Sequence, residues 1–199
     1  MPVTERPVVC LASVSPRRRE LLAQIGVRHS VAAAHVEERL LPGEPPGDYV
    51  ARLARLKATT VRDRGEVLPV LAADTAVVLD RVVYGKPADR AEGLAILAAL
   101  AGRTHEVLTA VALATARSVA LRINSSSVRF RNIARAEMEA YWETGEPRDK
   151  AGGYAIQGYG AVFVAALSGS YSGVMGLPLL ETAELLRGAG IRCWMGAAP

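Results

Sequence analysis

The stretch Leu71-Ala72-Ala73-Asp74-Thr75-Ala76-Val77-Val78 decides how this chain folds. It lies within Val67–Leu79, which is nearly all apolar and predicts one or two strands buried on both faces. Asp74 and Thr75 interrupt the apolar run. A carboxylate in such surroundings is costly to bury unless it is paired or binds a metal. The sequence leaves two interpretations of Asp74: a salt-bridged residue at a strand end, or a residue that binds Mg²⁺ or activates water.

Strands and helices alternate on both sides of this run. Apolar and alternating patterns predict strands at 8–12, 31–34, 107–114, 161–167 and 191–194, and a hairpin or meander within 119–130. Helical spacing, with capping residues at the starts and glycines at the ends, predicts helices at 16–25, 48–64, 89–100, 134–144 and 178–188. We expect an α/β fold, a mixed twisted sheet with flanking helices, as a single domain over residues 1–199.

Composition and charge set limits on the class of protein. Half of the residues are hydrophobic and 5% are aromatic, so a core of Ala, Val and Leu is expected. The net charge of +4 fits an anionic small molecule, weak nucleic-acid contact or an ordinary soluble surface equally well. Neither a signal peptide nor a transmembrane run is visible, and the two cysteines suggest no disulfide framework. The cytoplasm is the expected compartment.

The segment Ser13-Val14-Ser15-Pro16-Arg17-Arg18 is a candidate phosphate site. Ser15 suits the N-cap of a helix and Pro16 its first position. Backbone N–H groups at a helix start attract anions, whereas Arg17 and Arg18 are disfavoured there unless an anion lies between them and the amides. A solvated basic turn is the alternative.

Two lysines and a pair of glutamates are further candidates. Lys57 falls on the apolar stripe of its predicted helix, so its ammonium either reaches water along the surface or points into a site. Lys86 lies in the turn Gly85-Lys86-Pro87. Glu37 and Glu38 are adjacent, and one of such a pair is usually just solvated.

The glycine-rich segment from Asp149 to Gly158 can approach a ligand closely, because its glycines leave the backbone accessible. Within it, the Gln157 amide offers a donor and an acceptor that can pair with the imide edge of a pyrimidine. Together these carboxylates, cations and the glutamine suit metal-assisted attack on a polyphosphate. Serine-hydrolase chemistry is poorly supported, since there are three histidines and no Gly-x-Ser-x-Gly motif.

Six blocks in this chain resemble the signatures of the Maf family of nucleotide pyrophosphatases. They keep the family's order and spread over nearly the whole chain: Leu11–Leu22, Arg52–Ala58, Ala73–Thr75, Gly85–Pro87, Asp149–Gly158 and Val174–Leu179. The resemblance implies a fold similar to that of inosine triphosphate pyrophosphatases, with two lobes around a cleft. It also implies hydrolysis of nucleoside triphosphates that depends on a divalent cation, Mg²⁺ or Mn²⁺.

The resemblance also implies roles for individual residues. Asp74 is expected to be the general base or to hold metal and water, and Glu37 to share the metal. The residues expected to bind the triphosphate are Ser15, Arg18, Lys57 and Lys86.

The family's subgroups differ at three positions that concern the base. Arg17, Thr75 and Gln157 match the subgroup that acts on dTTP and UTP, and modified pyrimidine nucleotides are further candidate substrates. A glutamine, unlike a carboxylate, can donate to the O4 atom of uracil or thymine. The resemblance implies a homodimer. The alternative is a non-catalytic nucleotide- or nucleic-acid-binding regulator of cell division, which the carboxylates near the phosphate donors make the poorer explanation.

Overall fold

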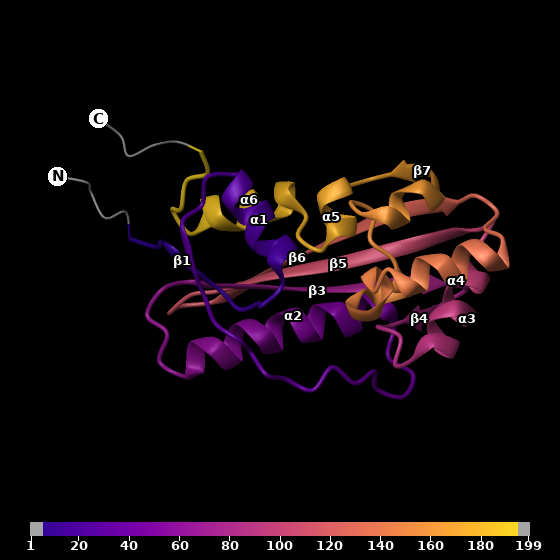
Figure 1. Cartoon of the computed structure of the whole chain (residues 1–199). Helices are drawn as coiled ribbons and strands as arrows, with labels where there is room; N and C mark the ends of the chain where they lie inside the picture. The colour runs from indigo at the N-terminus through magenta and orange to yellow at the C-terminus, as the bar shows by residue number, and fades with distance from the viewer. Residues whose placement is uncertain (1–5, 195–199) are drawn as a thin grey trace.

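The computed structural model describes residues 6–194, which form a seven-stranded mixed sheet with helices on both faces (Figure 1). The strand order is β2-β1-β3-β5-β6-β7, and the short β4 pairs with β3. β1 runs parallel to β2 and β3, and the other pairings are antiparallel. The strands span Val9–Leu11 (β1), His29–Val31 (β2), Val70–Leu79 (β3), Val82–Tyr84 (β4), Thr104–Ala114 (β5), Val119–Phe130 (β6) and Val164–Ser168 (β7). The predicted mixed sheet is confirmed.

All five predicted helices are present, each within two residues of its expected ends. The helices span Pro16–Gln24 (α1), Pro46–Asp63 (α2), Arg90–Leu100 (α3), Arg135–Glu143 (α4), Tyr171–Met175 (α5) and Leu179–Gly188 (α6). The predicted cap of α3 is confirmed, because the Glu92 N–H donates to the Asp89 carboxylate at 2.9 Å. The glycine-rich segment and the residues that flank it form short 3₁₀ helices at Glu146–Asp149, Ala151–Gly153 and Tyr159–Phe163.

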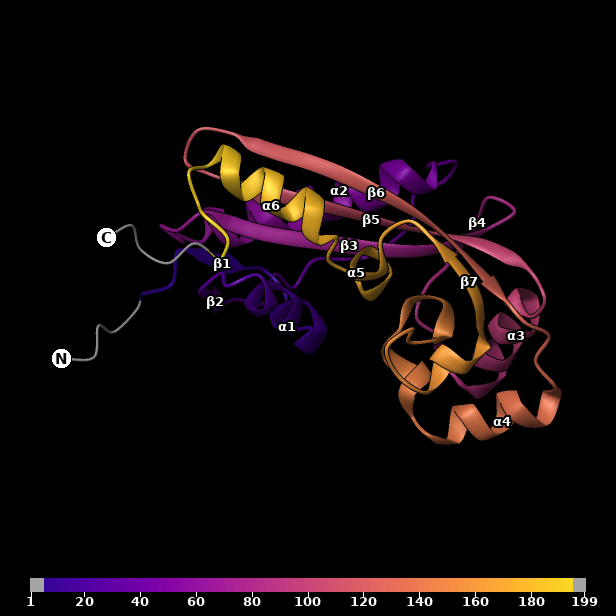
Figure 2. The same ribbon diagram turned by 90° about the horizontal axis from the view of Figure 1, so that it is seen from above.

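Alternate residues of β3 divide the core into layers. Ala72, Ala76 and Val78 pack on one face against the apolar stripe of α2. On the other face, Leu71 and Ala73 pack with α1 and α6, whereas Val77 and Leu79 pack with α3, α4 and the 3₁₀ segment. Figure 2 shows these two groups at opposite ends of the long strands. We call them the α1 end and the α4 end, and Thr75 lies between them.

Three sequence predictions are adjusted by the structure. The two alternating stretches within 119–130 form the single strand β6, because every residue of β5 from Thr104 to Ala114 pairs with it. The strand predicted at 31–34 ends at Val31, where its pairing with β1 stops. The strand predicted at 191–194 is wrong: these residues lie in no strand, and Trp194 has a left-handed φ of 41°.

The core consists mostly of Ala, Val and Leu side chains, as the composition predicts. Cys10 and Cys193 are buried free thiols, so neither takes part in a disulfide. Among residues 6–194, no helix combines the length and the apolar character that crossing a bilayer requires.

Candidate active site

Asp74 lies where one edge of β3 has no neighbouring strand. β1 pairs with β3 only at Val70 and Leu71, and β4 pairs with it only from Val77 onward. Between these points, residues 72–76 pair with β5 on one side, and no described strand pairs with them on the other. We call this stretch the free edge of β3. Ligands of α/β proteins bind where neighbouring strands part in this way, because loops and helix ends converge there.

Lys57 links two carboxylates at the free edge. Its Nζ atom lies 2.6 Å from Asp74 Oδ1 and 2.5 Å from Glu38 Oε1. The side chains of Lys57 and Asp74 are only 9% and 8% exposed. Lys57 sits on the apolar stripe of α2, so the helix packing itself carries the ammonium to Asp74. The Lys57 ammonium therefore points into a site and does not reach water along the surface.

Burial and the neighbouring cations act in opposite directions on Asp74. Burial raises the pKa of this carboxyl above its ordinary value, and the charges of Lys57 and Arg18 offset only part of that rise. At Glu38, burial acts to raise the pKa, but the hydrogen bond and charge of Lys57, together with the charges of Lys86 and Arg18, lower it overall. The two carboxyls therefore differ: Asp74 is the stronger base and Glu38 the more readily ionised group.

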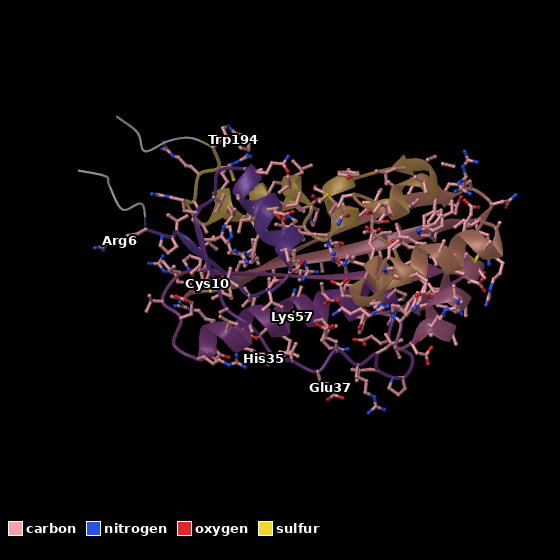
Figure 3. The ribbon with its side chains drawn as sticks, in the orientation of Figure 1. Arg6, Cys10, His35, Glu37, Lys57 and Trp194 are labelled. Carbon is pink, nitrogen blue, oxygen red and sulfur yellow. The ribbon has the colours of Figure 1, made fainter. Side chains whose placement is uncertain are left out.

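Glu38, and not Glu37, joins this site. The Glu37 side chain is exposed and makes no hydrogen bond or ion pair with the described residues; Figure 3 shows it at the rim of the molecule, away from Lys57. The Tyr49 hydroxyl donates to the Glu38 carbonyl at 3.2 Å and fixes this part of the segment on α2. That Glu37 shares a metal with Asp74 stays a prediction, but of the two glutamates it is Glu38 that contacts Lys57 in the described structure.

Arg52 holds the same segment from the next turn of α2. Its guanidinium donates to both oxygens of Glu44, at 2.6 and 2.7 Å, and to the Arg39 carbonyl at 2.9 Å. Sequence reasoning assigned no role to Arg52 or Tyr49. Their spacing of three residues on one helix face was the available signal.

Helix α1 begins at the free edge and brings Arg18 with it. The Arg18 guanidinium donates to the Gly176 carbonyl at 2.8 Å, to Thr75 Oγ1 at 3.3 Å and to Ser13 Oγ at 3.5 Å. Burial lowers the pKa of Arg18, and the Asp74 carboxylate opposes that shift. We use the term charged cluster for Arg18, Glu38, Lys57 and Asp74.

The first turn of α1 keeps its anion-binding groups available. Ser15 is the N-cap and Pro16 the first helical residue, as predicted, but the Ser15 side chain accepts no hydrogen bond from the first turn. Instead, the Ser15 N–H donates to Ser13 Oγ at 3.2 Å. The helix start therefore presents uncapped amides beside Arg17 and Arg18.

Lys86 lies at the rim of the charged cluster. Its Nζ atom is 3.6 Å from Glu38 Oε2, and its side chain is 59% exposed. An ammonium so placed is free to turn toward a ligand, because an exposed pair of this kind contributes little to stability.

The three residues expected to distinguish the base lie in different settings. Thr75 is fixed, since its hydroxyl bonds Arg18 and, at 3.0 Å, Thr109 Oγ1. Burial lowers the pKa of Arg17, while the carboxylates of Asp149 and Glu146 oppose that shift, so Arg17 lies in the electrostatic field of the glycine-rich segment. The Gln157 side chain is exposed and has no partner among the described residues.

The geometry brings cations and carboxylates from distant parts of the chain to one strand edge. α1 supplies Arg18, α2 supplies Lys57, and the segments before α2 and after β4 supply Glu38 and Lys86. Buried carboxylates with a shared ammonium suit the stabilisation of a polyanion and the transfer of a proton from water.

Comparison with known proteins shows which family this chain belongs to. Residues 8–189 match a family model described as "Maf-like protein". The dTTP/UTP pyrophosphatase of Saccharophagus degradans is 51% identical over 197 residues, which cover 95% of this chain and 92% of that protein. The dTTP/UTP pyrophosphatase of Alkalilimnicola ehrlichii is 54% identical over 187 residues, covering 91% and 92%. Among solved structures, the Ham1 protein of Staphylococcus aureus matches 61% of this chain and 71% of its own, with a TM-score of 0.38 and 13% identity.

Proposed function

Because this chain belongs to the Maf family, we propose that it is a nucleoside triphosphate pyrophosphatase. It hydrolyses dTTP and UTP, and modified pyrimidine nucleotides of similar shape, to the nucleoside monophosphate and diphosphate. The observation that carries this proposal is the charged cluster, in which the Lys57 ammonium contacts both Asp74 and Glu38 at the free edge of β3.

Asp74 accepts a proton from the water that attacks the triphosphate. Its raised pKa makes it a better base than an aspartate in water, and Lys57 and Arg18 favour its ionised form. Water adds across the bond between the α and β phosphates: its oxygen joins the nucleoside monophosphate, and the diphosphate leaves. The proton released passes to the Asp74 carboxylate.

Four residues bind the triphosphate. Arg18 and Lys57 are held by partners in the protein, so they supply positive charge at fixed positions without reorganisation. Ser15 adds the start of α1, and Lys86 reaches in from the rim. The charge that develops on the leaving diphosphate is thereby stabilised.

The residues present fit a divalent cation, Mg²⁺ or Mn²⁺, at Asp74 and Glu38. Oxygen atoms of both carboxylates lie within 2.6 Å of one ammonium, so both already face a single point of positive charge. Mg²⁺ is commonly held by one or two carboxylates together with substrate phosphates. When bound, the cation neutralises phosphate charge and orients the water. We assign the second ligand to Glu38 because Glu37 lies outside the cluster.

Gln157 recognises the base, with Arg17 and Thr75 shaping the same region. A glutamine amide can donate to O4 and accept from N3–H of uracil or thymine. The free, exposed Gln157 side chain supports this role, because no group in the described protein competes for its amide.

The setting of the enzyme follows from its substrate and its thiols. We place it in the cytoplasm, where free cysteines such as Cys10 and Cys193 persist. We expect a homodimer that acts on free nucleotides and not on nucleic acid.

The test is pyrophosphate release from a panel of canonical and modified nucleoside triphosphates, with Mg²⁺, with Mn²⁺ and with a chelator. We expect release of pyrophosphate, and not orthophosphate, from UTP and dTTP, and loss of that release with the chelator. A protein that turns over no nucleotide but binds DNA with a steep dependence on salt would instead be the regulator.

A further inference from the structure

The chain that follows Gln157 is anchored by one carboxylate. Glu146 accepts hydrogen bonds from the backbone N–H groups of Tyr159 and Gly160, at 3.0 and 2.9 Å. It also accepts from the Tyr141 hydroxyl at 2.7 Å. Two of these three donors lie within three residues of Gln157, so the carboxylate fixes the backbone on that side of it.

The Tyr141 hydroxyl anchors the chain that precedes Gln157. It accepts from the Ala155 N–H at 3.1 Å while it donates to Glu146. Tyr141 is only 4% exposed, and its ring meets Phe163 edge-on with 5.1 Å between centroids. Burial and the Glu146 carboxylate raise the pKa of Tyr141, so the hydroxyl keeps its proton. The Gln157 backbone is therefore tied on one side to Tyr141 of α4 and on the other to Glu146, in the 3₁₀ helix that follows α4, at the α4 end of the sheet (Figure 2).

Two glycines leave room for this anchor. A Cβ at Gly158 would lie 1.9 Å from Glu146 Oε2, and a Cβ at Gly160 would lie 2.8 Å from the Tyr141 hydroxyl. At Gly158 the limit is space and not backbone conformation, since φ is an ordinary −115°, and a Cβ there would displace the Glu146 carboxylate from the anchor. The glycines next to Gln157 thus serve the anchor as well as any approach of a ligand.

We propose that Tyr141 and Glu146 are positioning residues that fix the Gln157 backbone and so decide which pyrimidine is accepted. This rests on the proposed function, in which the Gln157 amide reads the base. In CTP the hydrogen-bonding roles at N3 and C4 are the reverse of those in UTP. The Gln157 side chain has no partner among the described residues, so its anchored backbone sets the point from which its amide reaches the base. The proposed function assigns the paired hydrogen bonds of this amide to uracil and thymine, so a looser backbone should weaken the binding of UTP more than that of CTP.

The test compares kcat/KM for UTP and CTP in Tyr141→Phe, Gln157→Ala and the double variant. Phenylalanine keeps the ring packing and removes both hydrogen bonds of the hydroxyl. We expect the UTP-to-CTP ratio to fall by about fivefold in Tyr141→Phe, the size of one net hydrogen bond, through KM for UTP and with kcat preserved. The double variant should match Gln157→Ala, because Tyr141 acts through Gln157. Glu146→Gln should give the same change in the UTP-to-CTP ratio, and it replaces Tyr141→Phe in the test if that variant does not fold.

Glu137→Gln is the matched control on the same helix. Glu137 also accepts from a backbone N–H, that of Ala134 at 3.0 Å, and from Arg131 at 2.6 Å, but it has no contact with residues 155–160. The UTP-to-CTP ratio of kcat/KM in Glu137→Gln should equal that of the wild type.

Two results in Tyr141→Phe would overturn the inference alone when Gln157→Ala lowers the ratio: an unchanged kcat/KM for both substrates, or an equal loss of kcat/KM for both. An unchanged ratio in Gln157→Ala would remove the base-reading role and the inference with it. Pyrophosphate release from UTP by the wild type, measured in the same assay, reports on the proposed activity separately.

Discussion

At the free edge of β3 the charged groups are held by contacts of their own side chains, whereas Gln157 is held only through its backbone. Arg18 has three partners and Lys57 has two, and the side chain of Asp74 is 8% exposed. Gln157 is exposed and has no described partner. This difference suits the proposed roles of the two regions. The charge of the triphosphate must be stabilised by groups that do not move, whereas the pyrimidine ring of the nucleotide must enter and leave the site.

The largest combined effect on stability and activity is expected from removing the shared ammonium. Lys57→Met leaves Asp74 and Glu38 without their common partner, in a site where both Lys57 and Asp74 are buried. We expect the free energy of unfolding to fall by about 3 kcal/mol and kcat/KM for UTP to fall more than about 100-fold. Urea unfolding and pyrophosphate release measure the two effects.

Arg135→Met is the control for this variant. Arg135 pairs with Glu139 at 2.7 Å on the surface of α4, and the exposed pair should contribute less than about 1 kcal/mol. If both variants lost equally little stability, the Lys57 pair would be as weak as a surface ion pair, and the comparison between the two regions would lose its basis.

The two adjacent glutamates give the next largest effect. Glu38→Gln should lower kcat/KM for UTP by about 100-fold with Mg²⁺ present, because it weakens a metal ligand and the contact with Lys57. Glu37→Gln should stay within about twofold of the wild type, since a surface substitution of this kind changes little. Titration of Mn²⁺ would show weaker metal binding in Glu38→Gln alone. If Glu37→Gln lost activity and Mn²⁺ binding while Glu38→Gln did not, Glu37 would be the metal ligand.

A smaller effect is expected on the pH at which kcat/KM falls in acid. Asp74 must be ionised to accept a proton, so kcat/KM should fall in acid below a pKa that lies above the ordinary 3.8. Because the Glu38 carboxylate raises the pKa of Asp74, Glu38→Gln should move this acid limb to lower pH and Glu37→Gln should not. If the fall of kcat/KM in acid came from protonation of the substrate, it would occur at the same pH in the wild type and in both variants.

The free energy of unfolding should also depend on pH through Asp74. A raised pKa means that the folded state binds more protons than the unfolded chain between 3.8 and the pKa of folded Asp74. The contribution of Asp74 to stability is therefore lost as the pH rises through that pKa. Asp74→Asn should remove this part of the pH dependence, as followed by thermal unfolding.

The smallest effect on the free energy of unfolding is expected at a turn whose residues have no assigned role in either region. Asp80 and Arg81 form the two-residue turn between β3 and β4 with φ of 51° and 69°, which glycine tolerates better than arginine. Arg81→Gly should raise the free energy of unfolding by about 1 kcal/mol without changing kcat, and it leaves the Asp80–Arg103 ion pair in place. Loss of stability would contradict this account of the turn.

The sequence indicated the buried part of the site better than its exposed part. A carboxylate inside an apolar run and a lysine on an apolar stripe are conspicuous because their burial is costly, and Asp74 and Lys57 do meet. Glu37 and Glu38 are identical letters in a loop, where no periodicity shows which one faces α2. The family resemblance pointed to Glu37, whereas the structure places Glu38 against Lys57.

The free edge of β3 could not be predicted, because it depends on where β1 and β4 stop pairing with β3. β6 was likewise read as alternating stretches, since its polar middle, Asn124 to Ser127, resembles a turn. Pairing with β5 continues through those residues. Strand register is set by such long-range pairing and not by local composition.

Pyrophosphate release from UTP by Asp74→Asn, measured beside its thermal unfolding, tests the central claim most directly. The account predicts that turnover falls by about 10³-fold, within the range for loss of a general base, while the protein stays folded. Near-normal turnover by the folded variant would show that the carboxylate at the free edge of β3 does not activate the water.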